Sequence, residues 1–157
     1  QKITRSLWFD INAEEAIGFY SSIFHNSNVT NKSYYCEGVP MPKGTMLAAT
    51  FSLEGLEFLA INGGPVFPFT EAVSFTVNCE NQEQVDYYWD ALLQDGGKES
   101  QCGWLKDKYG LSWQVTPVVM HKLLTDKDSE KAGRAMQAMM KMVKLDIAVL
   151  EKAFNGE

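Results

Sequence analysis

The residues best suited to chemistry in this chain are hydrogen-bonding side chains on strand-like segments, together with one arginine. Neutral amides and hydroxyls are contributed by Asn62, Ser74, Ser112 and Gln114. Arg5 adds a cation that can pair with a carboxylate or a phosphonate. This set favours recognition of a small polar or anionic ligand in a neutral cleft. The residue types allow an equal alternative, in which Arg5 pairs with a local acid and the amides satisfy backbone groups.

Metal-ligating and nucleophilic residues show no recognisable pattern. Cys36, Cys79 and Cys102 are an odd number of cysteines without a short spacing such as C-x-x-C, and the two histidines, His25 and His121, lie far apart in the sequence. Cys102 is close to the expected cleft but has no identifiable base. The sequence therefore predicts reduced structural thiols, no metal site and no cofactor.

Trp104 is the remaining candidate for a ligand contact. It either belongs to the core or lines the mouth of the cleft. The nearby segment 107–110, Asp-Lys-Tyr-Gly, predicts a hairpin turn and not a catalytic acid.

The elements that must position these residues occur twice in the same order. In the first half, strand-like segment 3–10 precedes a helix for which Asn12 is the expected N-cap and Glu15 the capping-box partner, and strand-like segments 29–37, 45–53 and 56–61 follow. In the second half, strand-like segment 72–77 precedes a helix in which Asn81 and Gln84 take the same roles. The apolar residues of the two helices match at one constant sequence offset. The second half ends with a short strand or loop at 98–101 and strands up to Pro117.

This repeat indicates one domain, 1–157, built from a first βαβββ module over 1–62 and a second over 71–117. The turn Asn62-Gly63-Gly64-Pro65 opens the joint between them. A tail over 118–157 is predicted to contain helices at 118–124, 129–142 and 145–154, with Asp128 or Ser129 capping the second. Its methionine-rich stripe is expected to pack on the body or on a second subunit.

Alternation along the strands predicts which side chains face the helices and which face the open, concave side. In the second module the helix-facing set is Phe75, Val77, Trp113 and Val115. Its concave set is Ala72, Ser74, Thr76, Ser112, Gln114 and Thr116. In the first module the expected concave set is Arg5, Leu7, Phe9, Phe58, Ala60 and Asn62.

Composition narrows the possible partners. The formal net charge of -6 argues against a nucleic-acid backbone or an anionic membrane as partner. No apolar run approaches the length of a membrane span, and no signal peptide is recognisable. A cytoplasmic protein without nucleic-acid or membrane partners is expected.

Several motifs resemble the PhnB-like family of the vicinal oxygen chelate superfamily. They are Leu7-Trp8-Phe9-Asp10, Ala13-Glu14-Glu15-Ala16, Phe19-Tyr20, Asn62-Gly63-Gly64-Pro65 with Phe67, segments 82–89, 102–107 and 110–117, and Lys144-Leu145-Asp146-Ile147. The family also carries the domain name 3-demethylubiquinone 3-methyltransferase, and the superfamily includes glyoxalase I, extradiol dioxygenases and the bleomycin and fosfomycin resistance proteins. The resemblance covers nearly the whole chain.

The resemblance implies an α+β homodimer in which the two modules form a curved mixed sheet around a cleft, with a C-terminal helical tail. Metal-using relatives hold a divalent ion with His or Glu from the first, fourth, fifth and last strands. The matching positions here are Arg5, Ala60 or Asn62, Ala72 or Ser74, and Gln114. None of them is an anionic or imidazole ligand, so the usual metal centre is expected to be missing.

The function predicted from these observations is small-molecule binding of the glyoxalase/bleomycin resistance type, without that metal centre. The alternatives are a lyase-like or dioxygenase-like enzyme, a methyltransferase as the family name suggests, and a dimeric module with a vestigial cleft. The glycine-rich turn at 62–65 joins two strands, whereas loops that bind S-adenosylmethionine usually join a strand to a helix. Binding of S-adenosylmethionine is therefore not expected.

Overall fold

The computed structural model describes residues 2–157, which divide into two compact units on either side of the Phe69–Thr70 bond. The boundary falls inside the joint predicted at 62–71. Each unit contains one βαβββ module, and the second also contains the C-terminal helices. The α+β class and the repeat are confirmed. No helix in the described part of the chain is long and apolar enough to cross a membrane.

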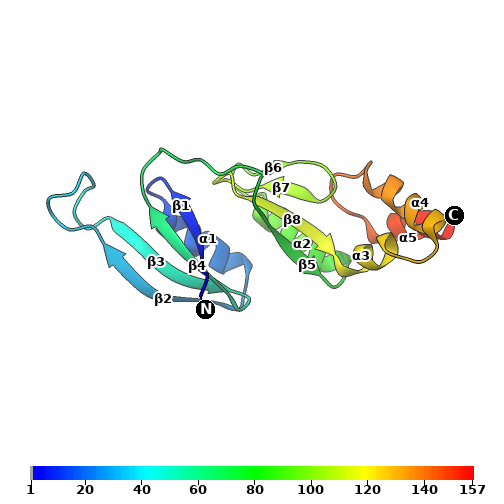
Figure 1. Ribbon diagram of the computed structural model, residues 1–157, viewed down its shortest axis with the longest axis horizontal. Helices are drawn as coiled ribbons and strands as arrows, with labels where there is room; N and C mark the ends of the chain where they lie inside the picture. Colours follow the sequence, from blue (N-terminus) through cyan, green and yellow to red (C-terminus); the bar gives the residue numbers. More distant parts are fainter. Residues whose placement is uncertain (1) are drawn as a thin grey trace. The chain divides into compact units, whose positions relative to one another are not determined.

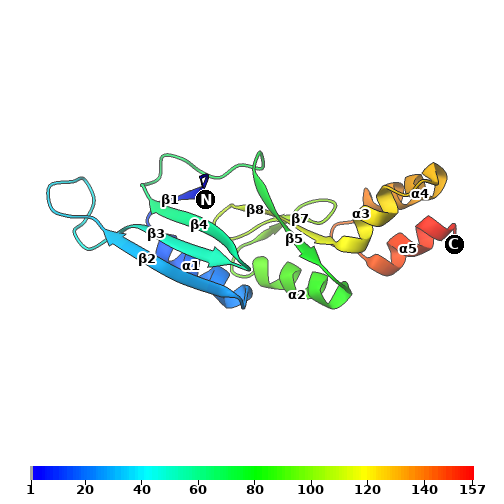
Figure 2. The same cartoon turned by 60° about the horizontal axis from the view of Figure 1, so that its bottom comes forward.

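The first unit is a four-stranded mixed sheet with one helix on a single face (Figures 1 and 2). Its elements are β1 (Arg5–Phe9), α1 (Ala13–Ile23), β2 (Ser27–Tyr34), β3 (Met46–Leu53) and β4 (Leu56–Asn62). The strand order is β1-β4-β3-β2, with β1 parallel to β4 and the other pairs antiparallel. The first and last strands of the module are therefore neighbours.

The second unit repeats this arrangement and extends it. Its elements are β5 (Ser74–Cys79), α2 (Gln82–Leu92), β6 (Lys98–Glu99), β7 (Trp104–Lys106), β8 (Ser112–Pro117), α3 (Val118–Leu124), α4 (Ser129–Met139) and α5 (Ile147–Asn155). The strand order is β5-β8-β7-β6, and the first and last strands are again parallel. The possible strand at 98–101 is the two-residue β6. Asp128, not Ser129, is the N-cap residue of α4, and its carboxylate accepts from the amides of Glu130 and Lys131.

The predicted faces of the second sheet are confirmed for the residues of β5 and β8, whereas Ala72 precedes β5 and belongs to neither face. Trp113 and Val115 are buried, and the same face packs against α2. Register places Phe75 beside Trp113 and Val77 beside Val115 on that face. Ser74, Thr76, Ser112, Gln114 and Thr116 therefore point to the open side, because side chains alternate along each strand.

The predicted faces of the first sheet are wrong. Leu7, Phe9, Phe58, Ala60 and Asn62 are buried, and the Asn62 side chain bonds to the first residue of α1, so this set faces the helix. The cause is a difference of one residue between the modules. Asp10, Ile11 and Asn12 separate β1 from α1, whereas only Glu80 and Asn81 separate β5 from α2. The constant sequence offset that relates the two helices therefore does not relate the strands of the two modules. A shift of one residue along a strand moves each side chain to the other face of the sheet.

The two helices also begin differently. Asn81 accepts from the amide of Gln84 at 2.9 Å, so the predicted N-cap of α2 is confirmed. The Gln84 side chain bonds back across the helix start as expected, but it accepts from the amide of Glu80, one residue before the N-cap, at 2.8 Å. The Asn12 side chain makes no such bond. Asn62, at the end of β4, takes its place and accepts from the amide of Ala13 at 2.8 Å.

Asn62 is 1 % exposed and uses both ends of its amide. Its nitrogen donates to the carbonyl of Met46 at 3.0 Å, at the start of β3. The Tyr35 hydroxyl donates to the carbonyl of Asn62 itself. One buried side chain thus connects β4, β3 and the first turn of α1.

The C-terminal segment is anchored to the second module by polar contacts around a buried leucine. The Gln82 amide donates to the carbonyl of Leu145 at 3.1 Å and accepts from the amide of Ile147 at 2.8 Å. The amides of Cys102 and Gly103 donate to Met142 and Val143. Leu145 is fully buried, and a Cβ at position 103 would lie 2.8 Å from its side chain, which explains the glycine there.

We expect Asn62→Ala to lower the free energy of unfolding by roughly 2–4 kcal/mol, because it leaves a buried N–H and a buried C=O without partners. Asn81→Ala is the matched control. It removes one exposed cap and should cost about 1 kcal/mol. Urea unfolding followed by circular dichroism measures both. Equal losses in the two variants would contradict the connecting role of Asn62.

Candidate functional site

The open face of the second sheet carries a grid of polar and aromatic side chains. Three neighbouring strands contribute two residues each, and cross-strand register places them in two rows. The rows are Ser74, Ser112 and Lys106, and Thr76, Gln114 and Trp104. Such neighbours lie close enough to contact one ligand, because side chains directly opposite each other in a sheet are about 5 Å apart.

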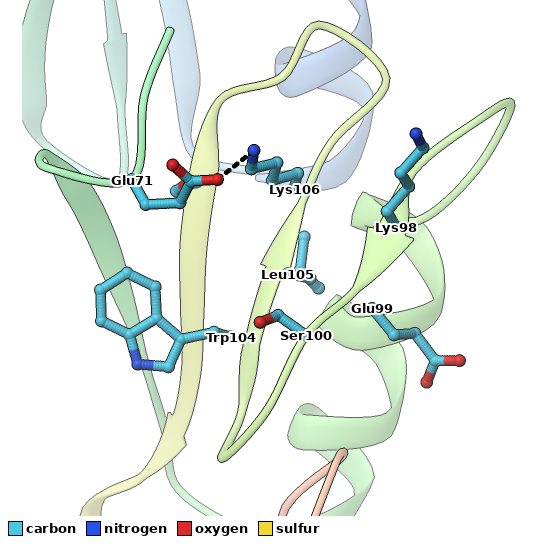
Figure 3. Close-up of a pocket in the computed structure, with 8 residues that line it drawn as sticks. Glu71, Lys98, Glu99, Ser100, Trp104, Leu105 and Lys106 are labelled. Carbon is cyan, nitrogen blue, oxygen red and sulfur yellow. Dashed lines mark ion pairs between the residues drawn. The ribbon is translucent and has the colours of Figure 1, made fainter.

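A pocket of about 220 Å³ lies at one end of this face. Figure 3 shows the residues that line it: Glu71, Lys98, Glu99, Ser100, Trp104, Leu105 and Lys106, with Ser112 as the eighth. The volume is below the roughly 300–1,000 Å³ usual for drug-sized ligands, so the pocket suits a smaller molecule.

The hydroxyl of Ser112 has no hydrogen-bond partner among the described residues, although Ser112 is only 1 % exposed. It is the one buried side-chain polar atom in residues 2–157 of which this is true. A buried polar group without a partner costs roughly 1–3 kcal/mol. Ser112 is one of the residues that line the pocket, so a bound molecule is a candidate for the missing partner.

Lys106, the cross-strand neighbour of Ser112, forms an ion pair with Glu71 (Figure 3). Glu71 precedes β5 and is exposed, and its bond to the Lys106 ammonium lowers the pKa of the Glu71 carboxyl. The pair places one cation and one anion at the pocket, both accessible to solvent.

The second row adds an amide and an indole. The Gln114 side chain donates to the Ser74 hydroxyl at 3.0 Å, and no residue of the described chain donates to the Gln114 oxygen. Trp104, half-buried on β7, offers a flat apolar surface beside Gln114. The face therefore combines an acceptor with an aromatic wall.

Four of the six residues predicted for the site lie together on this face: Trp104, Ser74, Ser112 and Gln114. Trp104 and Ser112 line the pocket, and Ser74 and Gln114 are their neighbours in the sheet. The other two, Arg5 and Asn62, belong to the first unit and bond within its fold. The Arg5 guanidinium donates to the carbonyl of Glu57 at 2.7 Å and lies 5.8 Å from the ring centre of Phe58.

Lys106 and its partner Glu71 line the pocket, although the sequence did not predict them as site residues. Alternation offered a signal for Lys106, because it is two residues from Trp104 and so shares its face. Glu71 lies outside the strand, so no periodicity could place it. Asp107 forms the predicted turn: it is buried, accepts from the Trp113 indole at 2.9 Å and also accepts from the amides of Tyr109 and Leu111.

The side chains present do not fit the divalent metal site of the superfamily. Among residues 2–157 no three His, Cys, Asp or Glu side chains cluster as a metal site requires. Of the two pocket carboxylates, Glu71 pairs with Lys106 and Glu99 accepts from the Trp89 indole at 3.2 Å. A divalent ion also needs anionic or imidazole donors to offset its dehydration, and lysine ammonium groups repel it.

The glycine-rich turn does not fit a loop that binds S-adenosylmethionine. The amides of Gly63 and Gly64 donate to the carbonyls of Phe9 and Asp10, and the Trp8 indole donates to the carbonyl of Gly64 at 2.9 Å. A Cβ at position 63 would lie 2.2 Å from the Trp8 ring, so glycine allows this close approach. The turn follows β4 and precedes no helix, and its amides are used inside the fold.

Comparisons with known proteins agree on one family. Residues 1–116 match the family model described as 3-demethylubiquinone-9 3-methyltransferase. The PhnB protein from Bacillus cereus is 42 % identical, with a TM-score of 0.68, over 75 % of this chain and 100 % of its own. No curated protein matches the chain.

More distant solved structures share the fold alone. Protein PA1353 from Pseudomonas aeruginosa is 18 % identical, with a TM-score of 0.59, over 73 % of this chain and 96 % of its own. The fosfomycin resistance protein FosX from Listeria monocytogenes, in complex with Mn(II) and sulfate, is 15 % identical, with a TM-score of 0.52, over 73 % and 87 %. These similarities match the two-module architecture.

We expect the purified protein to retain no stoichiometric divalent ion after dialysis, because the open face offers neutral donors and a lysine. Elemental analysis of the wild type, Gln114→Ala and Glu71→Ala checks this. About one zinc, nickel, manganese or iron per chain, lost in either variant, would contradict the expectation and identify the ligand residue.

Proposed function

Because the chain belongs to the 3-demethylubiquinone-9 3-methyltransferase family, within the glyoxalase/bleomycin resistance superfamily, we propose that it binds a small molecule in the pocket of its second sheet. The superfamily supplies the two-module frame. The residues that contact the ligand come from the open face of β5, β8 and β7.

The observation that carries this proposal is the Ser112 hydroxyl. Ser112 lines the pocket and is 1 % exposed, and its hydroxyl has no partner from the described chain. An alanine at this position would avoid the desolvation cost, so a serine destabilises the unliganded fold. A ligand that hydrogen-bonds to this hydroxyl would offset that cost in the complex.

The neighbouring groups define the shape of such a ligand. Trp104 supports a flat apolar body, and the Gln114 oxygen accepts from a donor on the ligand. Binding is the function that these groups support best, because the lining residues include neither a cysteine nor a histidine, and the Lys106 amine is held in an ion pair with Glu71. The glycine-rich turn does not support the methyltransferase activity in the family's name, since the amides of Gly63 and Gly64 bond within the fold.

We expect Ser112→Ala to raise the free energy of unfolding of the unliganded protein by about 1 kcal/mol, because it removes a buried hydroxyl that has no partner. Ser100→Ala is the matched control. Ser100 lines the same pocket but is exposed, so its removal should change stability by less than about 0.5 kcal/mol. Urea unfolding of both variants measures the difference. A destabilised Ser112→Ala would show that the hydroxyl is satisfied in the fold.

The binding function itself is tested by nuclear magnetic resonance with a set of small neutral and charged aromatic compounds. We expect at least one compound to shift the amide signal of Ser112 and the indole signal of Trp104 together, in a saturable manner. Ser112→Ala should lower the affinity for that compound by about tenfold, which corresponds to the loss of one hydrogen bond. No joint shift from any compound would contradict pocket binding.

The homodimer is a separate proposal, supported by surfaces that the chain leaves open. Seven of the eight residues of β2, an edge strand, are exposed, and the sheet presents there an unpaired backbone edge. The sheet faces opposite α1 and α2 have no helix from their own modules. Pairing of two chains would cover such edges and faces.

Light scattering at micromolar concentration should therefore give twice the chain mass of 17.6 kDa. A monomer mass at that concentration would contradict the dimer, but it would leave the pocket proposal untouched. Val29 is an exposed apolar residue of β2, and Val29→Lys should shift the mass toward that of the monomer, because a charge on this edge disfavours pairing of two chains.

A further inference from the structure

We propose that the ligand of this pocket is a small organic monoanion, such as an aromatic carboxylate, bound by the Lys106 ammonium and the Ser112 hydroxyl. Glu71 acts as an internal competitor that occupies Lys106 until the ligand displaces it. This inference rests on the proposed binding function and specifies the chemical class of its ligand.

The first step of the argument is the charge balance of the pocket. Lys98 and Lys106 are register partners on adjacent strands, so their ammonium groups share one face of the sheet. Like charges directly opposite each other destabilise a sheet. Lys106 is paired with Glu71, whereas Lys98 has no ion pair with any described residue. Of the two lysines of the pocket, Lys98 therefore has no anionic partner in the described chain.

The second carboxylate of the pocket lining does not compensate that charge. Glu99 is the register partner of Leu105, a buried residue on the α2 side of the sheet, so Glu99 follows the opposite face from Lys98. Its carboxylate accepts from the Trp89 indole of α2 at 3.2 Å. Figure 3 shows the Glu99 carboxylate directed away from Lys106 and Glu71. One negative charge from a ligand would complete the balance.

The position of that negative charge follows from the register of β7 and β8. Lys106 and Ser112 are opposite residues of an antiparallel pair, so a single carboxylate can accept from the ammonium and from the hydroxyl at once. Ser112 is the buried group without a partner, and it has one proton to donate. Trp104, two residues along β7 from Lys106, then lies beside the body of the ligand.

Glu71 occupies the place that the ligand carboxylate would take on Lys106. The side chain of Glu71 is 61 % exposed and that of Lys106 is 37 % exposed. An ion pair this accessible contributes little to stability, so a ligand that also reaches Ser112 can displace the glutamate. Glu71 thereby selects for ligands that offer more than a bare negative charge.

The test compares benzoate with benzamide, its neutral counterpart of similar shape, by titration of the isotopically labelled protein. We expect benzoate to shift the Ser112 and Trp104 signals with about tenfold higher affinity than benzamide, the scale of one charge-assisted hydrogen bond. Inorganic phosphate, titrated separately, should bind more weakly than benzoate, because it has no flat body to pack on Trp104.

Two variants assign the roles. Lys106→Met should reduce benzoate to the affinity of benzamide. Glu71→Gln should raise the affinity for benzoate several-fold and leave the affinity for benzamide unchanged, because Lys106 then has no anionic partner in the protein. Matched controls are Lys43→Met and Glu57→Gln, which change net charge equally at exposed positions of the first unit and should change neither affinity.

The outcomes separate this inference from the binding function on which it rests. Equal affinities for benzoate and benzamide would overturn the anion assignment while supporting the pocket. No shift of Ser112 or Trp104 with either compound would overturn the anion assignment and count against the binding function. If phosphate binds more tightly than benzoate, the carboxylate assignment is overturned and the ligand is a phosphate. An unchanged affinity for benzoate in Glu71→Gln would show that Glu71 does not compete with the ligand for Lys106.

Discussion

The first unit depends on one buried amide. The Asn62 side chain accepts from the amide that begins α1 and donates to the carbonyl that begins β3, while its backbone carbonyl accepts from Tyr35. These groups belong to segments far apart in the sequence, and Ala13, Met46 and Asn62 are buried. Asparagine suits this position because it carries a donor and an acceptor on one short, rigid side chain. The glycine pair follows directly and closes against Trp8.

In the second unit the equivalent stabilisation is local, and this difference matters for the site. Asn81 and Gln84 cap α2 from neighbouring positions, so β8 does not have to end in an inward amide. Ser112 and Gln114 lie on the open face of β8, and neither bonds to the helix. The two units share one topology but use their polar side chains differently. In the first unit Asn62 bonds to α1 and β3 inside the fold, whereas in the second unit Ser112 and Gln114 lie on the face opposite the helix.

The sequence predicted the element order and the faces of the second sheet because the alternation there is unambiguous. Phe75 and Val77 alternate with serine and threonine, and Trp113 and Val115 alternate with serine and glutamine. In β1 the residues Leu7, Trp8 and Phe9 are all apolar, so alternation cannot distinguish the two sides. The predicted faces of the first sheet were therefore wrong, and β1 is separated from α1 by one residue more than β5 is from α2. The ion pair of Lys106 with Glu71 depends on the path of a loop, which no periodicity records.

The C-terminal helices are attached to the second module by residues of the module itself. The family match ends at residue 116, so the helices that follow lie beyond it. Gln82 is inside the matched part, yet both ends of its side chain bond to Leu145 and Ile147 outside it, and Gly103 leaves the space that Leu145 fills. A homologous chain without these helices would leave an amide and an apolar hollow uncovered at those two positions. The helical segment and the residues at 82 and 103 therefore depend on one another structurally, so a transplanted module would need all of them together.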